Sequence, residues 1–417
     1  MTSPHQQSKL NLLLFKILSI HDDSVQAPLS LDPLELSRIS KMRDYVLKRH
    51  PDLVHYNHSL GRILGQEYPI EFKAPNQPMV NPISDEVEKE TLKFAGSNSL
   101  YVGKEAFLQK CGFGWLVGCV HPLMDKVSSE AISFYYTLLF NHDDFVDTGS
   151  QMEVKEQLEH IHEQLINVWK DQAPDPAFPQ LQTAHRLFTE YFKPNMNSEH
   201  KFSFEEESLR KYLQSVYQET EVKHVNEEEH LQNRQHTGGI RHAISVQCLR
   251  EGLDTFQMLY DTLTFDHLLR DVSDIVGILN DILSLKKELK QIQEAIKKDG
   301  KNPNDITEIK KRIQSNIVLI KFRDGLSLRE ALDKSLKLYH EKLDTFYNKK
   351  EFYLSKNPDP SNDAIKFLYI LEGWLFGHPL WAILSGRYNP ESHLTHEEIH
   401  QKISRTKILE RTDQVDV

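Results

Sequence analysis

Asp274–Glu288 reads DIVGILNDILSLKKE, an apolar segment in which Asn280, Ser284 and Glu288 recur at four-residue spacing. Each such step in an α-helix advances about 40° around the axis and about 6 Å along it, so the three side chains share one stripe. An amide, a hydroxyl and a carboxylate on one stripe can chelate a hard cation, and the adjacent Lys287 can reach a phosphate. The alternative is a polar stripe on an ordinary amphipathic helix.

A cluster of acids follows another apolar helical pattern. Ala131–Phe140 reads AISFYYTLLF and leads directly into NHDDFVD. Asp143 and Asp147 are four residues apart and share one helix face, whereas Asp144 lies about 100° away. Like charges on one face repel unless they are solvated or bridged by a cation, and Mg²⁺ prefers carboxylates together with phosphate oxygens. The alternative is a helix end whose acids face water.

An arginine precedes a double-glycine break in a third helical segment, Glu229–Ile240, which reads EHLQNRQHTGGI. Each glycine inside a helix costs about 1 kcal/mol relative to alanine, so a helix break is expected at Gly238. Such a break frees backbone carbonyls, and the neighbouring Arg234 can bind a phosphate through two hydrogen bonds. Taken alone, a helix–turn–helix with a surface arginine is the simpler interpretation.

The C-terminal segment Leu371–Pro390, LEGWLFGHPLWAILSGRYNP, is rich in aromatic residues. Aromatic faces stabilise a cation without reacting with it, so Trp374 and Trp381 are candidates for the lining of a cavity. Arg387 and Tyr388 together can hydrogen-bond an anion. For each tryptophan, simple core packing is the alternative.

Helical periodicity extends along the rest of the chain, and no run of alternating strand residues stands out. We therefore predict an all-α protein. We divide it into an N-terminal helical extension (residues 1–70), a domain that carries every motif (71–390) and a polar C-terminal tail (391–417). Residues 286–312 are dense in Lys, Glu and Gln around a Gly-Lys-Asn-Pro-Asn turn. We interpret them as a solvated helical hairpin inserted into the domain.

Composition and charge exclude several classes of protein. The formal net charge of −11 argues against general nucleic-acid binding, which needs a basic surface, but not against a small anionic substrate. No apolar run is long enough to suggest an integral membrane segment, and no signal peptide is recognised. The three cysteines, an odd and sparse set, favour a reduced compartment, and we expect a cytoplasmic protein.

The four motifs, in this order, resemble those of the class I terpene synthases, especially the single-α-domain cyclases of bacteria, fungi and some animals. The resemblance covers about residues 71–390. The family's aspartate-rich motif matches Asp143, Asp144 and Asp147. Its second motif, (N/D)Dxx(S/T)xxxE, matches Asn280, Asp281, Ser284 and Glu288. The diphosphate-sensing arginine, its linker and effector positions, and the closing Arg-Tyr pair match Arg234, Thr237, Gly238, Arg387 and Tyr388. The long insert and the first 70 residues depart from compact bacterial members, and the extended N-terminus is loosely similar to the soft-coral type.

The resemblance implies a fold, a reaction and a set of roles. It implies a helical bundle around an apolar cavity, in which three Mg²⁺ ions bind with the diphosphate of a linear isoprenyl diphosphate. The acidic motif and the second motif would bind the metals, with Asp144 acting more as a salt-bridge partner. Arg234, Lys287, Arg387 and Tyr388 would bind the diphosphate. The cavity lining would include Phe140, Trp374 and Trp381, together with Phe113 and Trp115.

Two other functions remain as alternatives. A linear isoprenyl diphosphate synthase would carry a second DDxxD motif where this chain has Asn280–Glu288. A non-catalytic helical scaffold would leave the acidic clusters as solvated faces. The chain length of the substrate stays open between farnesyl and geranylgeranyl diphosphate, with the soft-coral likeness favouring the latter, and a monomer and a homodimer are both compatible with the sequence.

Overall fold

The computed structural model describes residues 32–48, 51–76, 79–148, 151–196, 199–221 and 225–388. The predicted C-terminal tail (391–417) and the first 31 residues of the predicted extension lie outside this part of the chain. The protein divides into two compact units, Met1–Lys41 and Met42–Val417. Helix α2 (Pro33–Val46) begins in the first unit, where Arg38 Nε donates to Glu35 at 2.8 Å, and ends in the second.

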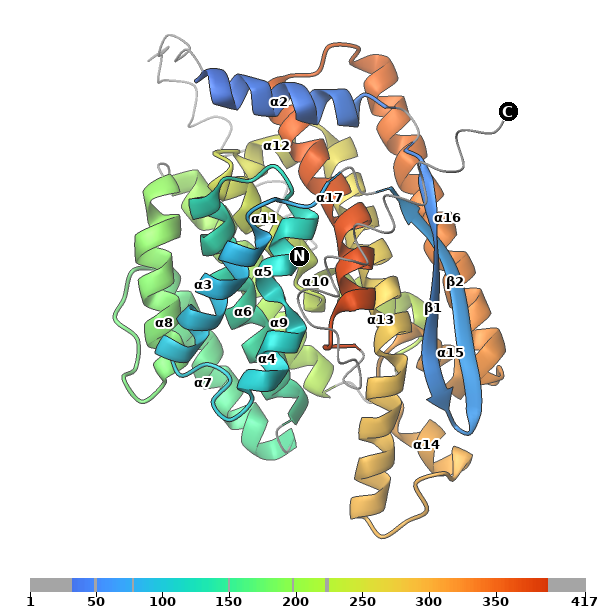
Figure 1. The fold of residues 1–417 in the computed structure, drawn as a ribbon. Helices are drawn as coiled ribbons and strands as arrows, with labels where there is room; N and C mark the ends of the chain where they lie inside the picture. The colour runs from blue at the N-terminus through green and yellow to red at the C-terminus, as the bar shows by residue number, and fades with distance from the viewer. Residues whose placement is uncertain are drawn as a thin grey trace, which may run out of the picture. The chain divides into compact units, whose positions relative to one another are not determined.

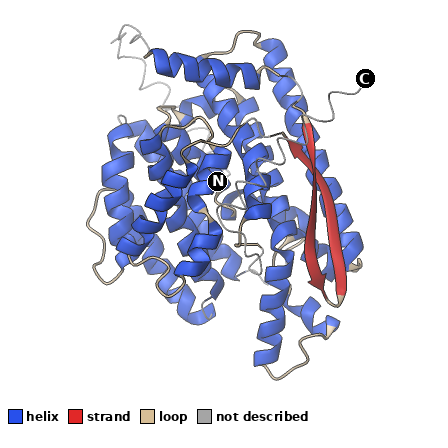
Figure 2. Cartoon of the chain, viewed as in Figure 1, coloured by secondary structure: helices blue, strands red, loops and turns tan. Residues whose placement is uncertain are grey.

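The second unit is built almost entirely of helices, as the sequence predicts (Figures 1 and 2). Most helices have one face of fully buried aliphatic and aromatic residues, which provides the core. After the end of α2, the helices of the second unit, short helical turns included, are α3 (Ser84–Ser97), α4 (Glu105–Cys111), α5 (Phe113–Val120), α6 (Lys126–Thr148), α7 (Gln151–Trp169), α8 (Pro179–Leu187), η1 (Phe188–Phe192), η2 (Lys193–Asn195), α9 (Glu199–Glu221), α10 (Glu227–Thr237), α11 (Ile240–Arg250), α12 (Thr255–Asp261), α13 (Leu263–Lys298), α14 (Ile306–Arg312), α15 (Ile317–Arg323), α16 (Leu328–Lys356) and α17 (Asn362–Leu384).

A β-hairpin corrects the prediction that residues 1–70 are helical. Strands β1 (Leu53–Ile63) and β2 (Gln66–Pro75) pair antiparallel (Figure 2), with Tyr56 opposite Phe72. Every second residue of β2 from Tyr68 onward is buried, and the Tyr56 and Phe72 rings stack at 5.2 Å. This two-residue period favours a strand, but β1 interrupts it, because the polar His58 lies on the same face as Tyr56 and Leu60 and the register shifts between Ser59 and Arg62.

Helix α13 is the longest described helix of the second unit and the one that positions the candidate site. Its N-cap is Thr262, whose side-chain oxygen accepts from Thr264 N at 3.3 Å. It packs against α10, α11, α15, α16 and α17, so its middle is buried on nearly all sides. The stripe of polar residues at Asn280, Ser284 and Glu288 therefore lies within the core and not on an ordinary solvated face.

Helix α17 is the described helix that is long and apolar enough to span a membrane by length and composition alone. However, 94% of its apolar window is buried inside the protein, as in a core helix. Its packing on α5 depends on glycines. A Cβ on Gly373 would lie 2.1 Å from the Val120 carbonyl oxygen, and one on Gly377 would lie 2.4 Å from the Cys119 carbonyl oxygen.

Residues 286–312 comprise the last turns of α13, a connection at 299–305 and helix α14, which packs back against α13. The apolar contact between the two helices includes Ile296 and Ile309, both fully buried. Outside this contact, Glu308 forms exposed ion pairs with Lys301 and Lys311 at 2.8 and 2.9 Å. The insert is thus a helix–turn–helix whose last turn returns toward the middle of α13.

Candidate active site

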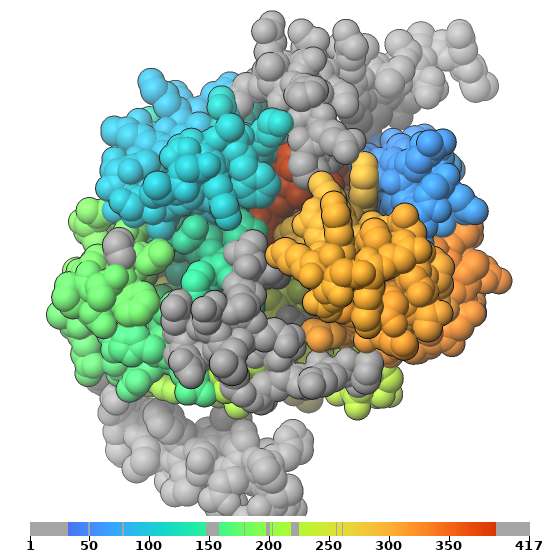
Figure 3. All heavy atoms as spheres, turned by 90° about the horizontal axis from the view of Figure 1, so that it is seen from below, coloured from blue at the N-terminus to red at the C-terminus, as the bar shows by residue number. Residues whose placement is uncertain are grey.

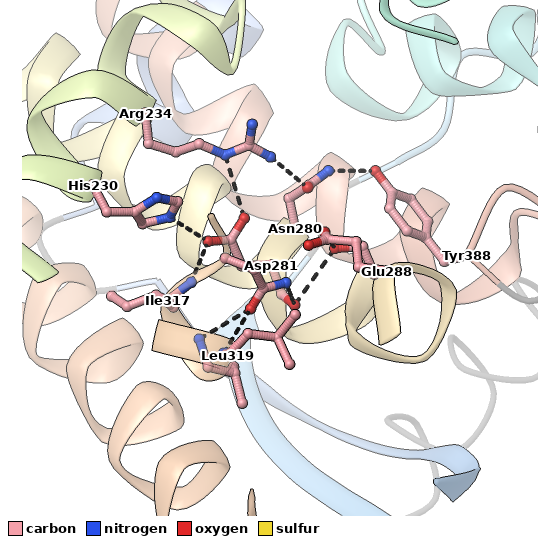
Figure 4. Close-up of polar contacts among 11 residues, drawn as sticks. His230, Arg234, Asn280, Asp281, Glu288, Ile317, Leu319 and Tyr388 are labelled. Atoms are coloured by element: carbon pink, nitrogen blue, oxygen red, sulfur yellow. Dashed lines mark hydrogen bonds and ion pairs between the residues drawn. The ribbon is translucent and has the colours of Figure 1, made fainter. Parts of the chain in front are cut away.

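The α13 stripe opens onto a cavity of about 320 Å³, which Asn280, Ser284 and Glu288 all line. The Ser284 hydroxyl donates to the Glu288 carboxylate. The Asn280 amide is held on both sides, since its oxygen accepts from Arg234 Nη2 and its nitrogen donates to the Tyr388 hydroxyl, each at 2.7 Å. The side chains of the stripe are therefore oriented before any ligand arrives (Figure 4).

Asp281 joins three helices beneath the stripe and was recognised in the sequence only as a motif position. His230 Nε2 of α10 contacts one carboxylate oxygen at 2.7 Å, and the backbone N–H of Ile317 in α15 donates to it at 2.8 Å. Arg234 Nε lies 3.3 Å from the other oxygen. Burial opposes the charged form, but Arg234 and His230 lower the pKa of Asp281, so it stays ionised. This network fixes Arg234 relative to α13 (Figure 4).

The predicted break after Arg234 is present. Helix α10 ends at Thr237 and α11 begins at Ile240, with Gly239 at a φ of 68°, which glycine adopts without strain. Thr237, Gly238 and Gly239 all line the cavity with Arg234. The arginine also lies over Gly277, where a Cβ would come within 2.9 Å of Arg234 Cγ. Gly277 therefore provides the room that lets the arginine lie flat on α13.

The acidic motif forms the opposite wall, at the end of α6. Asp143 lines the cavity and accepts from Arg387 Nη2 at 2.7 Å. Asp144 accepts from Arg387 Nη1 at 3.0 Å to both oxygens, and from the Tyr101 hydroxyl at 3.0 Å. Asp144 is absent from the cavity lining and so sits where a salt-bridge partner would. The side chain of Asp147 lies outside what the structure describes.

Arg387 and Tyr388 connect the two walls. Arg387 contacts the acidic motif and lies 4.5 Å above the ring centroid of Phe140. Tyr388 accepts from Asn280 on α13, and its ring meets the edge of Trp381 at 5.6 Å. Burial raises the pKa of the Tyr388 hydroxyl to about 12, so it remains a neutral hydrogen-bonding group. The predicted Arg-Tyr pair therefore closes the site between α6 and α13.

The rest of the lining is apolar and aromatic. Phe140, Trp374 and Trp381, which the resemblance implies as lining, lie along this cavity together with Leu116 and Tyr136. The structure does not place Phe113 or Trp115 in the lining. Phe113 instead stacks on Phe140 at 4.5 Å from behind, because the short helix α5 is buried over its whole length.

Several lining residues were missed in the sequence because they come from the insert and from the segment after it. Arg312, Gln314, Ser315 and Asn316 join Lys287 at this end of the cavity. The charged composition of 286–312 indicated a solvated segment, yet the last turn of α14 returns to the cavity. Of these residues, Asn316 has a recognisable sequence signal, because an asparagine directly before the apolar run Ile317–Ile320 is typical of a helix N-cap. In the structure it caps α15 at a φ of 73°, and its side chain donates to the Asp281 carbonyl at 2.7 Å.

The charged and apolar parts of the cavity are separated along three helices. On α6, Tyr136 and Phe140 precede Asp143, and Trp374 and Trp381 of α17 precede Arg387, which lies beyond the last residue of that helix. On α13, Val276 likewise precedes the polar stripe. Because Arg387 contacts Asp143 and the adjacent Tyr388 contacts Asn280, these polar groups gather at one end. Figure 3 views the second unit from below, with the orange atoms of α13 and α14 across from the light blue atoms of α3 and α4. The arrangement suits a molecule with an anionic head and an apolar chain.

The polar stripe has the donor chemistry of a hard-cation site. Asn280, Ser284 and Glu288 present only oxygens to such an ion, and an amide oxygen has a second lone pair besides the one that Arg234 occupies. Burial, with the nearby Asp281 charge, raises the pKa of Glu288 to about 7, because these surroundings disfavour its negatively charged form. A bound cation would stabilise that charged form. Among the described side chains, no three His, Cys, Asp or Glu residues already form a metal cluster.

Comparison with known proteins identifies the family. Residues 135–345 match the family model described as terpene synthase family 2, C-terminal metal binding. The chain is 20% identical over 379 residues to the (+)-eremophilene synthase of Gibberella fujikuroi, covering 84% of this chain and 96% of that protein.

Solved structures share the fold at low sequence identity. The α-eudesmol synthase structure matches with a TM-score of 0.63 and 16% identity, covering 76% of this chain and 100% of that one. A linalool/nerolidol synthase from Streptomyces clavuligerus, solved with 2-fluorogeranyl diphosphate, matches with a TM-score of 0.58 and 17% identity, covering 75% and 98%. Because the family match spans more than half of the chain and the fold agrees with it, the chain belongs to the terpene synthase family, as an all-α class I terpene synthase and therefore a lyase with a metal-binding domain.

Proposed function

We propose that this terpene synthase is a cyclase, which ionises a linear isoprenyl diphosphate with Mg²⁺ and folds the resulting carbocation into a ring. The observation that carries the proposal is the separation of the cavity into a charged end and an apolar aromatic end. A diphosphate fits the first and an isoprenyl chain the second. The 2-fluorogeranyl diphosphate bound by the Streptomyces clavuligerus synthase supports an isoprenyl diphosphate as the ligand class.

The proposed metal ligands are Asp143 and Asp147 on one wall and Asn280, Ser284 and Glu288 on the other, with Asp144 as the salt-bridge partner of Arg387 within the acidic motif. Three Mg²⁺ ions, bound with the diphosphate, would act as Lewis acids that stabilise the charge of the leaving group. The protein itself orients the Asn280 amide through Tyr388 and through Arg234, which Asp281 holds in turn.

Four cationic or hydroxyl groups are placed to bind the diphosphate. Arg234, Lys287, Arg387 and Tyr388 all line the charged end of the cavity. Their hydrogen bonds strengthen as negative charge develops on the leaving oxygens, which lowers the barrier to C–O cleavage. The break at Thr237 and Gly238 places backbone groups beside Arg234, and we propose that the Gly238 carbonyl dipole faces the developing cation.

The apolar end would fold the substrate and protect the carbocation. Phe140, Trp374 and Trp381 present aromatic faces, whose negative quadrupoles stabilise a passing cation without attacking it. Water would capture the cation as an alcohol, so an apolar lining also favours ring closure. The depth of this end sets the accepted chain length, with farnesyl and geranylgeranyl diphosphate as the two candidates.

Incubation of the purified protein with geranyl, farnesyl and geranylgeranyl diphosphates, with and without Mg²⁺, tests the proposal by gas chromatography–mass spectrometry. We expect a cyclic product that requires Mg²⁺ from one of the two longer substrates. Asn280→Ala and Asp143→Ala should lower the rate by about 100-fold or more, since each removes a proposed metal ligand. Asn348→Ala and Asp333→Ala, at exposed positions on α16, are the matched controls.

The same assay distinguishes the alternatives. Longer linear diphosphates on addition of isopentenyl diphosphate would identify a prenyl-chain synthase. An absence of turnover with every substrate, in a folded protein that binds Mg²⁺ and inorganic diphosphate no better than Asn280→Ala does, would reject the cyclase.

A further inference from the structure

A second cavity, of about 260 Å³, lies among α6, α7, α8 and α9. Its lining is dominated by large apolar side chains, including Phe145, Leu165, Trp169, Phe188 and Leu209. The proposed cyclase mechanism assigns no role to this space. The cavity reaches the surface at the exposed residues Ala177 and Gln180, and its apolar walls would be covered by an apolar occupant.

The lining of the second cavity defines the chemistry of that occupant. Among the residues that the structure describes, no Asp, Glu, Lys or Arg lines it. Two of its polar groups already contact protein partners, since the Tyr135 hydroxyl meets His242 and the Tyr212 hydroxyl lies 3.4 Å from His142 Nδ1. The neutral amides of Asn141 and Gln180 also line it. An anion or a strongly hydrogen-bonding ligand would lose its hydration there without compensation. The cavity suits a neutral hydrocarbon.

The two cavities share part of their walls. Leu139 of α6 and Tyr212 of α9 line both of them. The Tyr212 ring lies against the double-glycine break, where a Cβ on Gly239 would be 3.4 Å from it. A side chain and a ring thus stand between the space where the cyclic product would form and the apolar space behind it.

We propose that the second cavity binds a neutral isoprenoid hydrocarbon, of the kind formed in the first cavity, on the far side of the Leu139–Tyr212 wall. The inference rests on the proposed cyclase function for the identity of the occupant. A cyclic terpene is apolar, whereas one end of the first cavity is lined by charged groups. Dry apolar cavities accept apolar molecules of matching size, so the adjoining space is a favourable place for the product.

Binding of farnesene, a hydrocarbon without a diphosphate, tests the proposal without Mg²⁺ and without turnover. Titration calorimetry should give about two molecules bound per chain in the unaltered protein. Ala184→Phe fills the second cavity and should remove one of them, whereas Ala243→Phe fills the first and should remove the other. Ala177→Phe, at an exposed position that also lines the second cavity, repeats the test if Ala184→Phe does not fold.

The outcomes separate this proposal from the cyclase proposal. Loss of all farnesene binding in Ala243→Phe, with unchanged binding in both second-cavity variants, would overturn it. Binding of palmitate but not farnesene in the second cavity would also overturn the proposal, because the occupant would then be a fatty acid. A dimer that Ala184→Phe dissociates would overturn it as well, because the occupant would then be a second copy of the chain. Turnover is measured separately, so an inactive protein that binds farnesene in both cavities would reject the cyclase and leave the hydrocarbon site standing.

Discussion

Arg387 is the residue on which the acidic wall depends. Its guanidinium donates to Asp143 through one nitrogen and to both oxygens of Asp144 through the other, while its own side chain is 5% exposed. The sequence predicted an anion-binding arginine here, and the resemblance favoured Asp144 as a salt-bridge partner. The structure assigns both features to Arg387, because the arginine proposed to bind the diphosphate is also the salt-bridge partner of Asp143 and Asp144.

Replacement of Arg387 by lysine should weaken both roles. A single ammonium cannot reproduce the contact of one nitrogen with both oxygens of Asp144 while also reaching Asp143, which the second guanidinium nitrogen does. We expect the free energy of unfolding to fall by about 1–3 kcal/mol, because the half-buried Asp144 loses part of its compensation. Urea unfolding measures this. Arg43→Lys, whose partner Asp359 is highly exposed, should change stability by less than about 0.5 kcal/mol. Equal losses in both variants would contradict the assignment.

Single residues were predictable where a motif gave both their type and their spacing. Asn280, Ser284 and Glu288 share one helical stripe, so their convergence on one cavity follows from the period of the helix. Residues brought in by the path of the chain were not predictable. His230 reaches Asp281 across 51 positions, and Arg312 enters the cavity only because α14 packs back on α13.

At the scale of the element, α13 positions Arg234 through a glycine. A Cβ at Gly277 would press on Arg234 Cγ, whereas alanine is a better helix former by about 1 kcal/mol. Gly277→Ala should therefore lower turnover of the isoprenyl diphosphate about tenfold or more while the melting temperature stays the same or rises. Gly96→Ala in α3, where a Cβ meets nothing within 4 Å, should raise the melting temperature and leave turnover unchanged. Similar kinetics in the two variants would show that Arg234 does not need the space.

The crossing of α5 and α17 gives a second prediction for an element. A Cβ on Gly377 would lie 2.4 Å from the Cys119 carbonyl oxygen, and neither backbone can move away inside the core. Gly377→Ala should destabilise the protein by about 1–3 kcal/mol despite the gain in helix propensity. Thermal unfolding measured beside Gly96→Ala provides the comparison, and stabilisation of both variants would mean that the helices separate easily.

The elements differ in how far the sequence determined them. Helices such as α13 and α16 show apolar residues at three- and four-residue spacing over many turns, so their existence is clear from the period alone. The hairpin was missed because the alternation in β1 is interrupted by His58 on the inward face and by the register shift between Ser59 and Arg62. Its turn at Leu64 and Gly65 has positive φ at both positions. Such turns usually carry Asn, Asp or Gly at both positions, so the leucine at 64 removes the usual sequence signal for a hairpin turn.

At the scale of the molecule, buried histidines and buried glutamates make the stability of the fold change with pH in opposite directions. Burial lowers the pKa values of His121, His242 and His378 to about 3, so they are neutral in the folded protein. Their contribution is fully present above the unfolded pKa, about 6.5, and is lost as pH falls toward 3. Burial raises the pKa of Glu88 to about 7 and that of Glu205 to about 8. These carboxyls favour the protonated folded state, and their contribution falls as pH rises above about 4.5.

Glu205→Gln isolates the loss of stability that a buried carboxyl causes as pH rises. Glu205 is 2% exposed, and its carboxyl contacts the Ser245 hydroxyl at 2.6 and 2.7 Å, a contact that an amide can keep. Glutamine resembles the protonated carboxyl and cannot ionise, so the variant should lose the decline that Glu205 contributes between about pH 4.5 and 8. Each unit of pKa difference is about 1.4 kcal/mol, and we expect a gain on the order of 3 kcal/mol at pH 8 relative to pH 5. Urea unfolding at a series of pH values measures it, with the exposed Glu294→Gln as the control. Parallel curves for Glu205→Gln and the unaltered protein would mean that water reaches this carboxyl in the folded state.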